Sequence, residues 1–321
     1  MRTSFIKTLY EIAAHNPRVT LIVGDLGFGV VTEFAERYPN QFINAGVSEQ
    51  NMTGLAAGMA MAGRIVFTYS IANFPTLRCL EQIRNDVCYH AANVKIVAVG
   101  GGYAYGSLGM THHATEDLAI LRSLPGMKVV APGDPVETRL AVQTLVQDPS
   151  PCYLRLGRAG EAAIHAGDID FAIGRAITVL EGTDATLIST GGMLENCLKV
   201  ARRLKAEGLQ VQVISMHTVK PLDERAVVQA GLKTGVVLTV EEHSEVGGLG
   251  SAVADVLLQV GYQGVFRKVA LPDRFSAVAG DFEYLRALGG LDVESITNVV
   301  RKAVGTADAG LVHTARVGAI G

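Results

Sequence analysis

The sequence contains the stretch VKIVAVGGGYAYGSLGMTHH at residues 94–113, and this stretch indicates how the chain folds. Its first six residues are mostly apolar and β-branched, as in a strand buried on both faces of a parallel sheet. The glycine-rich loop that follows ends in His112 and His113. Because ligands of open α/β sheets bind outside the carboxyl ends of the strands, this loop is a candidate site.

The loop itself leaves three interpretations open. It is not a dinucleotide-binding G-x-G-x-x-G motif, because Tyr105 stands where the third glycine belongs. His112, His113, Glu116 and Asp117 are residue types that bind metals, but adjacent histidines point in different directions. A structural turn and a histidine that faces a substrate are the other two interpretations.

On either side of this stretch, short β-branched runs alternate with helical patterns, which is typical of βαβ units in a parallel sheet. The predicted strands are Val19–Val23, Ile65–Tyr69, Val94–Val99, Lys128–Ala131 and Tyr153–Leu156. The predicted helices are Thr3–His15, Glu49–Ala62, Thr76–Ala92, Glu116–Ser123 and Pro135–Gln147. The pattern therefore predicts a doubly wound α/β domain over residues 1–165.

A second α/β series follows the polar, glycine-containing stretch 158–168 and predicts a smaller layered domain over residues 166–305. Its strands are expected at 176–180, 185–189, 211–215, 236–240 and 265–270, and its helices at 193–207, 224–230, 251–260 and 295–304. Within it, the acidic stretch Glu241–Ser251 is expected to be a strand-to-helix turn, because its carboxylates disfavour phosphate. Residues 306–321 are weakly patterned and are expected to form a flexible tail.

The composition excludes several classes of function. Hydrophobic residues make up 49% and charged residues 18% of the 321 residues, with a net charge of −3 and no cluster of Lys or Arg. Nucleic-acid and membrane partners are therefore not expected. The four scattered cysteines favour neither a zinc site nor disulfides, and the amino terminus lacks the apolar core of a signal peptide. We expect a cytoplasmic protein.

A second informative stretch, NAGVSEQNMTGLAAGMAMA at residues 44–62, places one carboxylate, Glu49, at the start of a helix of small and apolar residues. The next dozen residues contain no basic side chain, and an unpaired acid is costly to bury. Glu49 is therefore expected to face water, where it stabilises the helix dipole, or to await a ligand. Gly54, Gly58 and Ala62 share one helical face, which favours an interface.

Three motifs, in this order and at this spacing, resemble the carboxyl-terminal half of transketolases. They are GVSEQNM at 46–52, Thr111-His112-His113 after the glycine-rich loop, and PCYLRLGR at 151–158. The similarity extends to 1-deoxyxylulose-5-phosphate synthases and to β-subunits of 2-oxo acid dehydrogenases, and it covers about residues 1–305. It implies the pyrimidine-binding domain of a thiamine diphosphate enzyme, followed by the family's carboxyl-terminal domain.

The resemblance also implies how the chain binds the cofactor. Glu49 matches the glutamate that hydrogen-bonds the ring nitrogen of the aminopyrimidine and promotes the tautomer that deprotonates the thiazolium carbon. Phe74 falls where an aromatic residue stacks on the pyrimidine, with core packing as the alternative. Asp25 is a further candidate for contacting the cofactor.

For the substrate, the resemblance points to histidine and arginine side chains. His112 matches the histidine of the family's Thr-His-Gln motif, which contacts sugar hydroxyls, and His113 replaces the glutamine. Arg158 matches a basic residue that holds a substrate phosphate, and Arg2 is a candidate for a second one.

Departures from the family pattern bear on the choice of sugar. Leu108 replaces an aspartate that reads a sugar hydroxyl, and a buried hydroxyl without its partner costs about 1–3 kcal/mol. Gly100 and Gly29 stand where transketolases usually have phosphate-contacting His and Ser. We therefore expect a modified, shortened or less phosphorylated ketose.

The family's magnesium-binding motif, Gly-Asp-Gly followed by an Asn, is reduced here to Gly24-Asp25-Leu26. The resemblance therefore implies a separate large subunit that holds the diphosphate and Mg²⁺, in an α2β2 assembly. This chain is then the small subunit of a split transketolase, which transfers a two-carbon ketol unit from a ketose to an aldose. Two alternatives remain: the β-subunit of a 2-oxo acid or acetoin dehydrogenase, and a non-catalytic interaction subunit.

Overall fold

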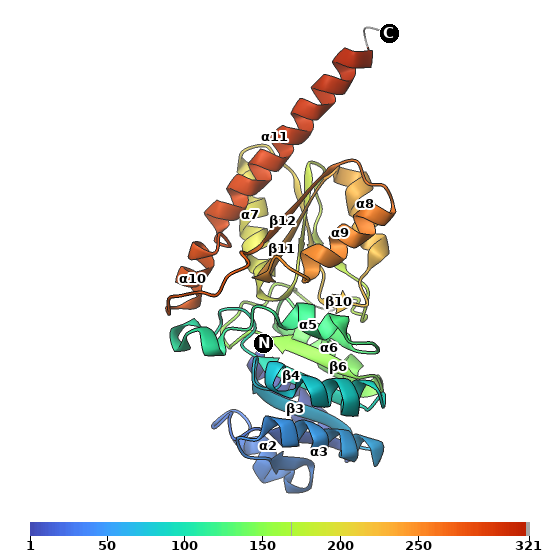
Figure 1. Cartoon of the computed structure of the whole chain (residues 1–321), viewed down its shortest axis with the longest axis vertical. Coiled ribbons are helices and arrows are strands. Elements are labelled where there is room, and N and C mark those ends of the chain that lie inside the picture. The colour runs from blue at the N-terminus through green and yellow to red at the C-terminus, as the bar shows by residue number, and fades with distance from the viewer. Residues whose placement is uncertain (168, 319–321) are drawn as a thin grey trace.

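The structure is a computed structural model that describes residues 1–167 and 169–318, and the side chains of this range up to residue 307. Two α/β domains lie one above the other along the long axis of the molecule, and a long helix extends from the second domain (Figure 1). The predicted fold class is confirmed.

The first domain is built on a seven-stranded sheet of the described residues, in the order β10-β5-β6-β4-β3-β1-β2. Every pairing in it is parallel except that of β10 with β5. The strands are β1 Val19–Val23, β2 Phe42–Asn44, β3 Ile65–Ile71, β4 Val94–Val99, β5 Lys128–Val130, β6 Cys152–Leu156 and β10 Thr218–Lys220. Central strands β1, β4 and β6 are buried along their whole length, which explains their nearly continuous apolar sequence.

Helices cover both faces of this sheet. On one face α1 and α6 contribute Phe5, Leu9 and Leu145 to a core with β1, β3 and β6. On the other face α3 and α5 contribute Met52, Ala56 and Leu118. The helices of this domain include α1 Arg2–Ala13, α2 Thr32–Arg37, α3 Glu49–Met61, α5 Asp117–Ser123 and α6 Pro135–Gln147.

The predicted helix Thr76–Ala92 is wrong as a single element. It consists of three short pieces: η2 Leu77–Cys79, α4 Leu80–Gln82 and η3 Ile83–Cys88, the last with π-helical hydrogen bonding. Such π segments are frequent at functional sites. The Thr76 hydroxyl and the Cys79 thiol donate to the carbonyl oxygens of Ala72 and Phe74, which ties the first turn to the end of β3.

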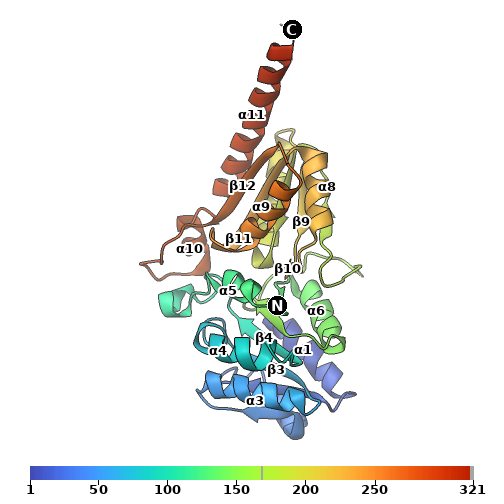
Figure 2. The same ribbon diagram turned by 45° about the vertical axis from the view of Figure 1, so that its right-hand side comes forward.

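The second domain contains a five-stranded sheet of described residues in the order β12-β11-β8-β9-β7, parallel except for β7. Its strands are β7 Ile177–Leu180, β8 Ala185–Ser189, β9 Val211–Ser215, β11 Val236–Ser244 and β12 Val265–Leu271. Its helices are α7 Leu194–Ala206, α8 Glu224–Thr234, α9 Leu249–Gln259, α10 Phe282–Leu288 and α11 Val293–Gly318. Helices α8 and α9 lie together on one face of this sheet, whereas α7 and α11 pack on the other (Figure 2).

Strand β10 connects the two domains, and helix α11 extends beyond the second one. Strand β10 follows β9 of the second domain but pairs antiparallel with β5 of the first. Helix α11 continues to Gly318, so the segment expected to be a flexible tail is helical over residues 306–318, and residues 319–321 lie outside the described residues. Over the described chain, none of the helices is both long and apolar enough to cross a membrane.

Candidate active site

The sequence-predicted site residues follow the carboxyl ends of neighbouring strands in the first sheet. Asp25 follows β1, Glu49 follows β2, Phe74 follows β3, His112 follows β4 and Arg158 follows β6. Because these strands are parallel, all five loops emerge at the same edge of the sheet. The structure therefore gathers at one edge residues that are distributed over most of the first domain.

Glu49 begins α3, and its side chain is only 2% exposed. Its carboxylate lies near the Cα of Gly24, where an added Cβ would be 3.5 Å from the Glu49 Cγ. Arg78 donates from Nη1 to Glu49 Oε2 at 2.7 Å. The expectation that Glu49 has no basic partner is thus wrong, because the partner comes from the turn after β3.

Phe74 contacts both the Arg78 guanidinium and the His112 ring. The guanidinium carbon is 4.6 Å from the centre of the Phe74 ring, and the His112 ring meets Phe74 edge-on with centres 5.2 Å apart. The Asn73 amide donates to the carbonyl oxygens of Thr111 and His113, which joins the loops after β3 and β4. These contacts place Glu49, Phe74 and His112 in one cluster.

His113 has a different environment from His112. Its side chain is 3% exposed, and its ring packs edge-on against Tyr103 with centres 4.9 Å apart. Its Nε2 lies 3.4 Å from the carbonyl oxygen of Gly106. The predicted substrate contact of His113 therefore has no support in this geometry, which gives the ring a place inside the loop.

Asp25 is exposed at the end of β1 and is held by Asn44. The Asn44 amide donates to Asp25 Oδ1 at 2.9 Å, and the Asp25 backbone N–H donates to Asn44 Oδ1 at 3.0 Å. This reciprocal pair fixes the turn after β1, in which Asp25 has a φ of 55°. Among the described residues, no group of three or more His, Cys, Asp or Glu side chains is arranged to hold a metal ion.

The backbones of Arg158 and Arg2, the two predicted basic substrate contacts, are adjacent. The Arg2 backbone N–H donates to the Arg158 carbonyl oxygen at 3.0 Å. Arg158 Nη1 donates to the Ala104 carbonyl oxygen at 3.3 Å, and its guanidinium carbon lies 5.5 Å from the centre of the Tyr105 ring. The exposed Arg158 side chain is thus held beside the glycine-rich loop.

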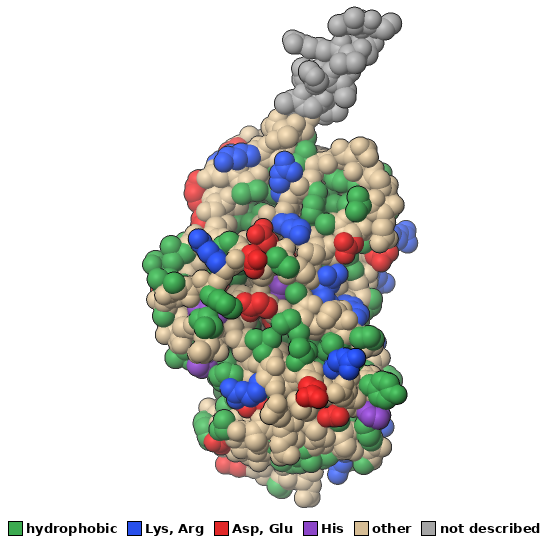
Figure 3. Space-filling view, in the orientation of Figure 1, with side chains coloured by type: hydrophobic (Ala, Val, Ile, Leu, Met, Phe, Trp, Pro, Cys, Tyr) green, Lys and Arg blue, Asp and Glu red, His purple; other side chains and the backbone are tan. Residues whose placement is uncertain are grey.

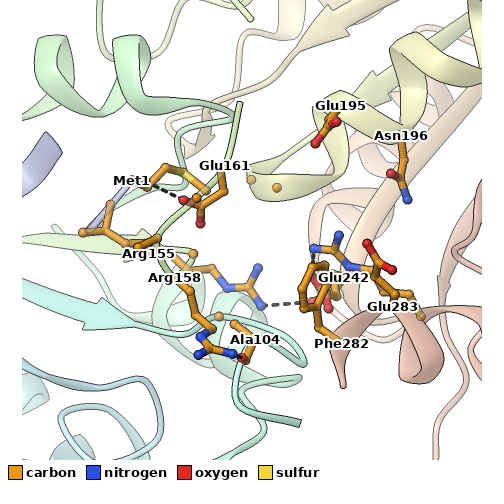
Figure 4. A pocket seen from close by; sticks show the side chains of 18 of the residues that line it. Met1, Ala104, Arg155, Arg158, Glu161, Glu195, Asn196, Glu242, Phe282 and Glu283 are labelled. Atoms are coloured by element: carbon orange, nitrogen blue, oxygen red, sulfur yellow. Dashed lines mark hydrogen bonds and ion pairs between the residues drawn. The ribbon is translucent and has the colours of Figure 1, made fainter. Parts of the chain in front are cut away.

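Arg158 also lines a cavity of about 690 Å³ at the junction of the two domains. Figure 4 shows Arg158 and Glu161 on the wall formed by the first domain, and Glu195 and Asn196 of α7 on the facing wall. Both acidic and basic side chains line this cavity, so it has no single sign of charge.

The cavity floor is a buried ionic network that crosses between the domains. Arg155 Nε donates to Asp117 Oδ2 at 2.7 Å, and Arg155 Nη2 donates to the Glu242 carbonyl oxygen at 3.0 Å. Arg286 of α10 donates to Glu242 Oε2 at 2.6 Å. Burial opposes the charge of Arg155, but Asp117 raises the pKa of its guanidinium overall, so Arg155 stays charged. It fixes the second domain against the glycine-rich loop.

Sequence reasoning missed three residues of the site: Arg78, Asn44 and Tyr105. Asn44 lies in the stretch 44–62 and Tyr105 in the stretch 94–113. Their position at or after the end of a strand and their polar side chains could have indicated that they belong to the site. Arg78 had a weaker signal, namely that it is a basic residue following Phe74 in an otherwise apolar segment.

Comparison with known proteins agrees with this geometry. Residues 1–160 match the family model of the transketolase pyrimidine binding domain, and residues 174–296 match that of the transketolase C-terminal domain. One subunit of the apulose-4-phosphate transketolase of Phocaeicola vulgatus is 39% identical over 297 residues, covering 92% of this chain and 94% of the relative. The 6-deoxy-6-sulfo-D-fructose transketolase subunit SqwH of a Clostridium species is 35% identical, covering 94% of each.

Among solved structures, one described as a split gene transketolase, inactive beta4 tetramer, is 38% identical with a TM-score of 0.86. The match covers 95% of this chain and 98% of that one. Both domains, their order and nearly the whole length are thus shared with proteins that are separate subunits. The chain therefore belongs to the transketolase family, as the subunit of a split transketolase that carries the pyrimidine-binding and C-terminal domains.

Proposed function

We propose that this chain supplies the pyrimidine-binding half of an α2β2 transketolase, whose large subunit holds the diphosphate of thiamine diphosphate and Mg²⁺. The complex transfers a two-carbon ketol unit from a ketose donor to an aldose acceptor. The observation that carries this proposal is the cluster of buried Glu49 with half-buried Phe74 and His112 at one edge of the sheet.

The Glu49 and Phe74 side chains fit the pyrimidine end of the cofactor. A buried carboxylate beside an aromatic face suits a flat heterocycle that carries ring nitrogens and an amino group. Thiamine diphosphate, when bound, supplies the carbanion chemistry. In our proposal Glu49 holds a proton at the pyrimidine ring nitrogen, Phe74 orients the ring, and burial excludes water from the carboxylate.

His112, Arg158 and Arg2 are the proposed contacts to the sugar. His112 is half-buried beside Phe74, where it can reach a hydroxyl near the reacting carbon. Arg158 is exposed at the end of β6 and suits a terminal anionic group. The relatives are named for a phosphorylated and a sulfonated sugar, which supports an unusual anionic ketose. Leu108 is exposed in the glycine-rich loop that also carries His112, and its side chain offers no acceptor for a sugar hydroxyl.

The proposed partner is supported by the exposed surface beside the site. Hydrophobic side chains gather over α10 and the loop that contains the short turns η4 Gly106–Leu108 and η5 Met110–His112 (Figure 3). The exposed apolar residues of this region are Leu108, Met110, Phe275, Phe282, Tyr284 and Leu288. An apolar surface around a substrate histidine is typical of a face that another protein covers. All four cysteines are free thiols, which suits the proposed cytoplasmic location.

The experiment is a ketol-transfer assay with a panel of ketose donors, thiamine diphosphate and Mg²⁺. It compares the chain alone, the chain with its large subunit, and the Glu49→Gln variant of the complex. We expect activity in the complex only, and a loss of about 10²–10⁴-fold in Glu49→Gln. Glu224→Gln, an exposed acid of α8, is the matched control and should be unaffected. Turnover by the chain alone would contradict the proposal.

A further inference from the structure

The Arg78 guanidinium is in contact with both side chains that we assign to the pyrimidine. Its Nη1 is 2.7 Å from Glu49 Oε2, and its central carbon is 4.6 Å from the centre of the Phe74 ring. Within the described part of the chain, this guanidinium donates no other hydrogen bond. We call the space between the Glu49 carboxylate and the Phe74 ring the Glu49–Phe74 site.

A guanidinium and an aminopyrimidine make similar demands on such a site. Each is flat, each can share a proton in its plane with the carboxyl group of Glu49, and each has a face that stacks on an aromatic ring. Glu49 is 2% exposed, so its carboxylate has little room for two partners at once. The two groups are therefore expected to compete.

Resting on the function proposed above, we propose that Arg78 is a displaceable occupant of the Glu49–Phe74 site. In the chain alone it pairs with the Glu49 carboxylate, and it moves into solvent when the cofactor's pyrimidine takes its place. Its side chain is 46% exposed, so the path to solvent is open. Arg78 is in this sense a positioning residue, because it acts on the cofactor site through Glu49.

The competition sets the sign of the effect of removing Arg78. Without Arg78, the buried Glu49 carboxylate lacks its cation and the chain alone is less stable. When the pyrimidine is bound, the ion pair is already broken in the wild type, so removing Arg78 does not destabilise the bound form. Deleting the guanidinium must then favour cofactor binding, whereas deleting a residue that held the cofactor would have the opposite effect.

The test measures the dissociation constant of thiamine diphosphate by calorimetry in the assembled complex with Mg²⁺. We expect Arg78→Met to bind about tenfold more tightly, because the variant lacks the ion pair that competes for the buried Glu49 carboxylate. We expect Arg78→Lys, which keeps the charge but not the flat group, to lie between Met and wild type. Arg84→Met, from an exposed arginine of η3, is the matched control and should equal wild type.

A second readout uses the chain alone. Arg78→Met should lower its unfolding temperature, and this loss should vanish in the Glu49→Gln background, which has no carboxylate to leave unpaired. If the wild-type complex binds thiamine diphosphate and Arg78→Met binds it equally or more weakly, the proposed role of Arg78 is overturned, but the proposed function is not. Failure of the wild-type complex to bind thiamine diphosphate would overturn the proposed function and this proposal with it.

Discussion

Gly100 directly follows β4 and has a φ of +93°, a conformation that glycine adopts without strain. A Cβ built on Gly100 would overlap the ring of Tyr105, which itself lies under the Arg158 guanidinium. The position has no room for the histidine usual in transketolases, because Tyr105 occupies that space. The departure at residue 100 and the stacking of Arg158 thus have one structural origin.

We predict that Gly100→Ala destabilises the chain by about 1–3 kcal/mol through overpacking, in addition to the strain of its positive φ. Gly29→Ala is the matched control, since Gly29 also has a positive φ but its added Cβ meets no atom within 4 Å. Urea unfolding of both variants measures the difference. Equal losses of stability would show that the Tyr105 ring is not the cause.

At the level of single residues, the motifs selected Glu49, Phe74 and His112, and these three residues lie in one cluster. The roles that the resemblance assigns to them stay predictions. The ion pair of Glu49 was not predictable from its neighbours, because Arg78 approaches from a different strand end. The burial of His113 was also not predictable, since adjacent histidines differ only in the direction that the backbone gives them.

The element scale is illustrated by α9 and the acidic stretch before it. Glu241 is fully buried and accepts hydrogen bonds from the backbone N–H groups of Leu249 and Gly250 at 2.7 and 2.6 Å. The chain's own carboxylate thus occupies the amino end of this helix, where an anion would otherwise bind. This agrees with the predicted strand-to-helix turn.

We predict that Glu241→Gln lowers the free energy of unfolding by about 1–3 kcal/mol, because one of the two accepting oxygens becomes an amide group that cannot accept a hydrogen bond. Glu245→Gln, an exposed acid of the same stretch, is the control and should have little effect. Chemical denaturation gives both values. A neutral Glu241→Gln variant would mean that the carboxylate does not stabilise α9.

Two elements show why periodicity alone was not enough. Strand β10 is three residues long and pairs with a strand of the other domain, so no local pattern distinguishes it. The segment 76–92 has a helical pattern, but its first turn is tied to the end of β3 and its last part widens to π geometry. In both cases tertiary contacts override the local preference.

At the scale of the whole molecule, the segment between the domains is attached to α6. The backbone N–H groups of Ile164 and His165 donate to Asp134 Oδ2 at 2.8 and 3.0 Å. His165 Nε2 lies 2.8 Å from Glu137 Oε1. Burial opposes the charges of both His165 and Glu137. The hydrogen bond between them nevertheless raises the pKa of His165. The same hydrogen bond, together with the backbone amide of Gly133, lowers the pKa of Glu137.

These shifts predict a pH dependence. Stability from a raised histidine pKa is fully present below its unfolded pKa of about 6.5 and is lost as the pH rises through the folded pKa. Stability from a lowered glutamate pKa is fully present above the unfolded value of about 4.3 and is lost as the pH falls through the folded pKa. The pair therefore contributes most between about pH 4.3 and 6.5.

The measurement is the unfolding temperature of wild type and His165→Gln across this range. The two should differ most between about pH 4.3 and 6.5, and the difference should shrink at higher and lower pH. His15→Gln replaces an exposed histidine after α1 and is the control. Its unfolding temperature should differ from that of the wild type by the same amount at every pH. A His165→Gln curve parallel to wild type would contradict the assigned ion pair.

In the function we propose, Glu49 of this chain activates a cofactor whose diphosphate is held by the large subunit. The most direct test is hydrogen–deuterium exchange at the thiazolium C2 carbon of thiamine diphosphate in the assembled complex, followed by NMR after rapid quenching. We predict fast exchange in wild type and exchange close to that of the free cofactor in Glu49→Gln, with the cofactor bound in both. Equally fast exchange in the two complexes would contradict this role of Glu49.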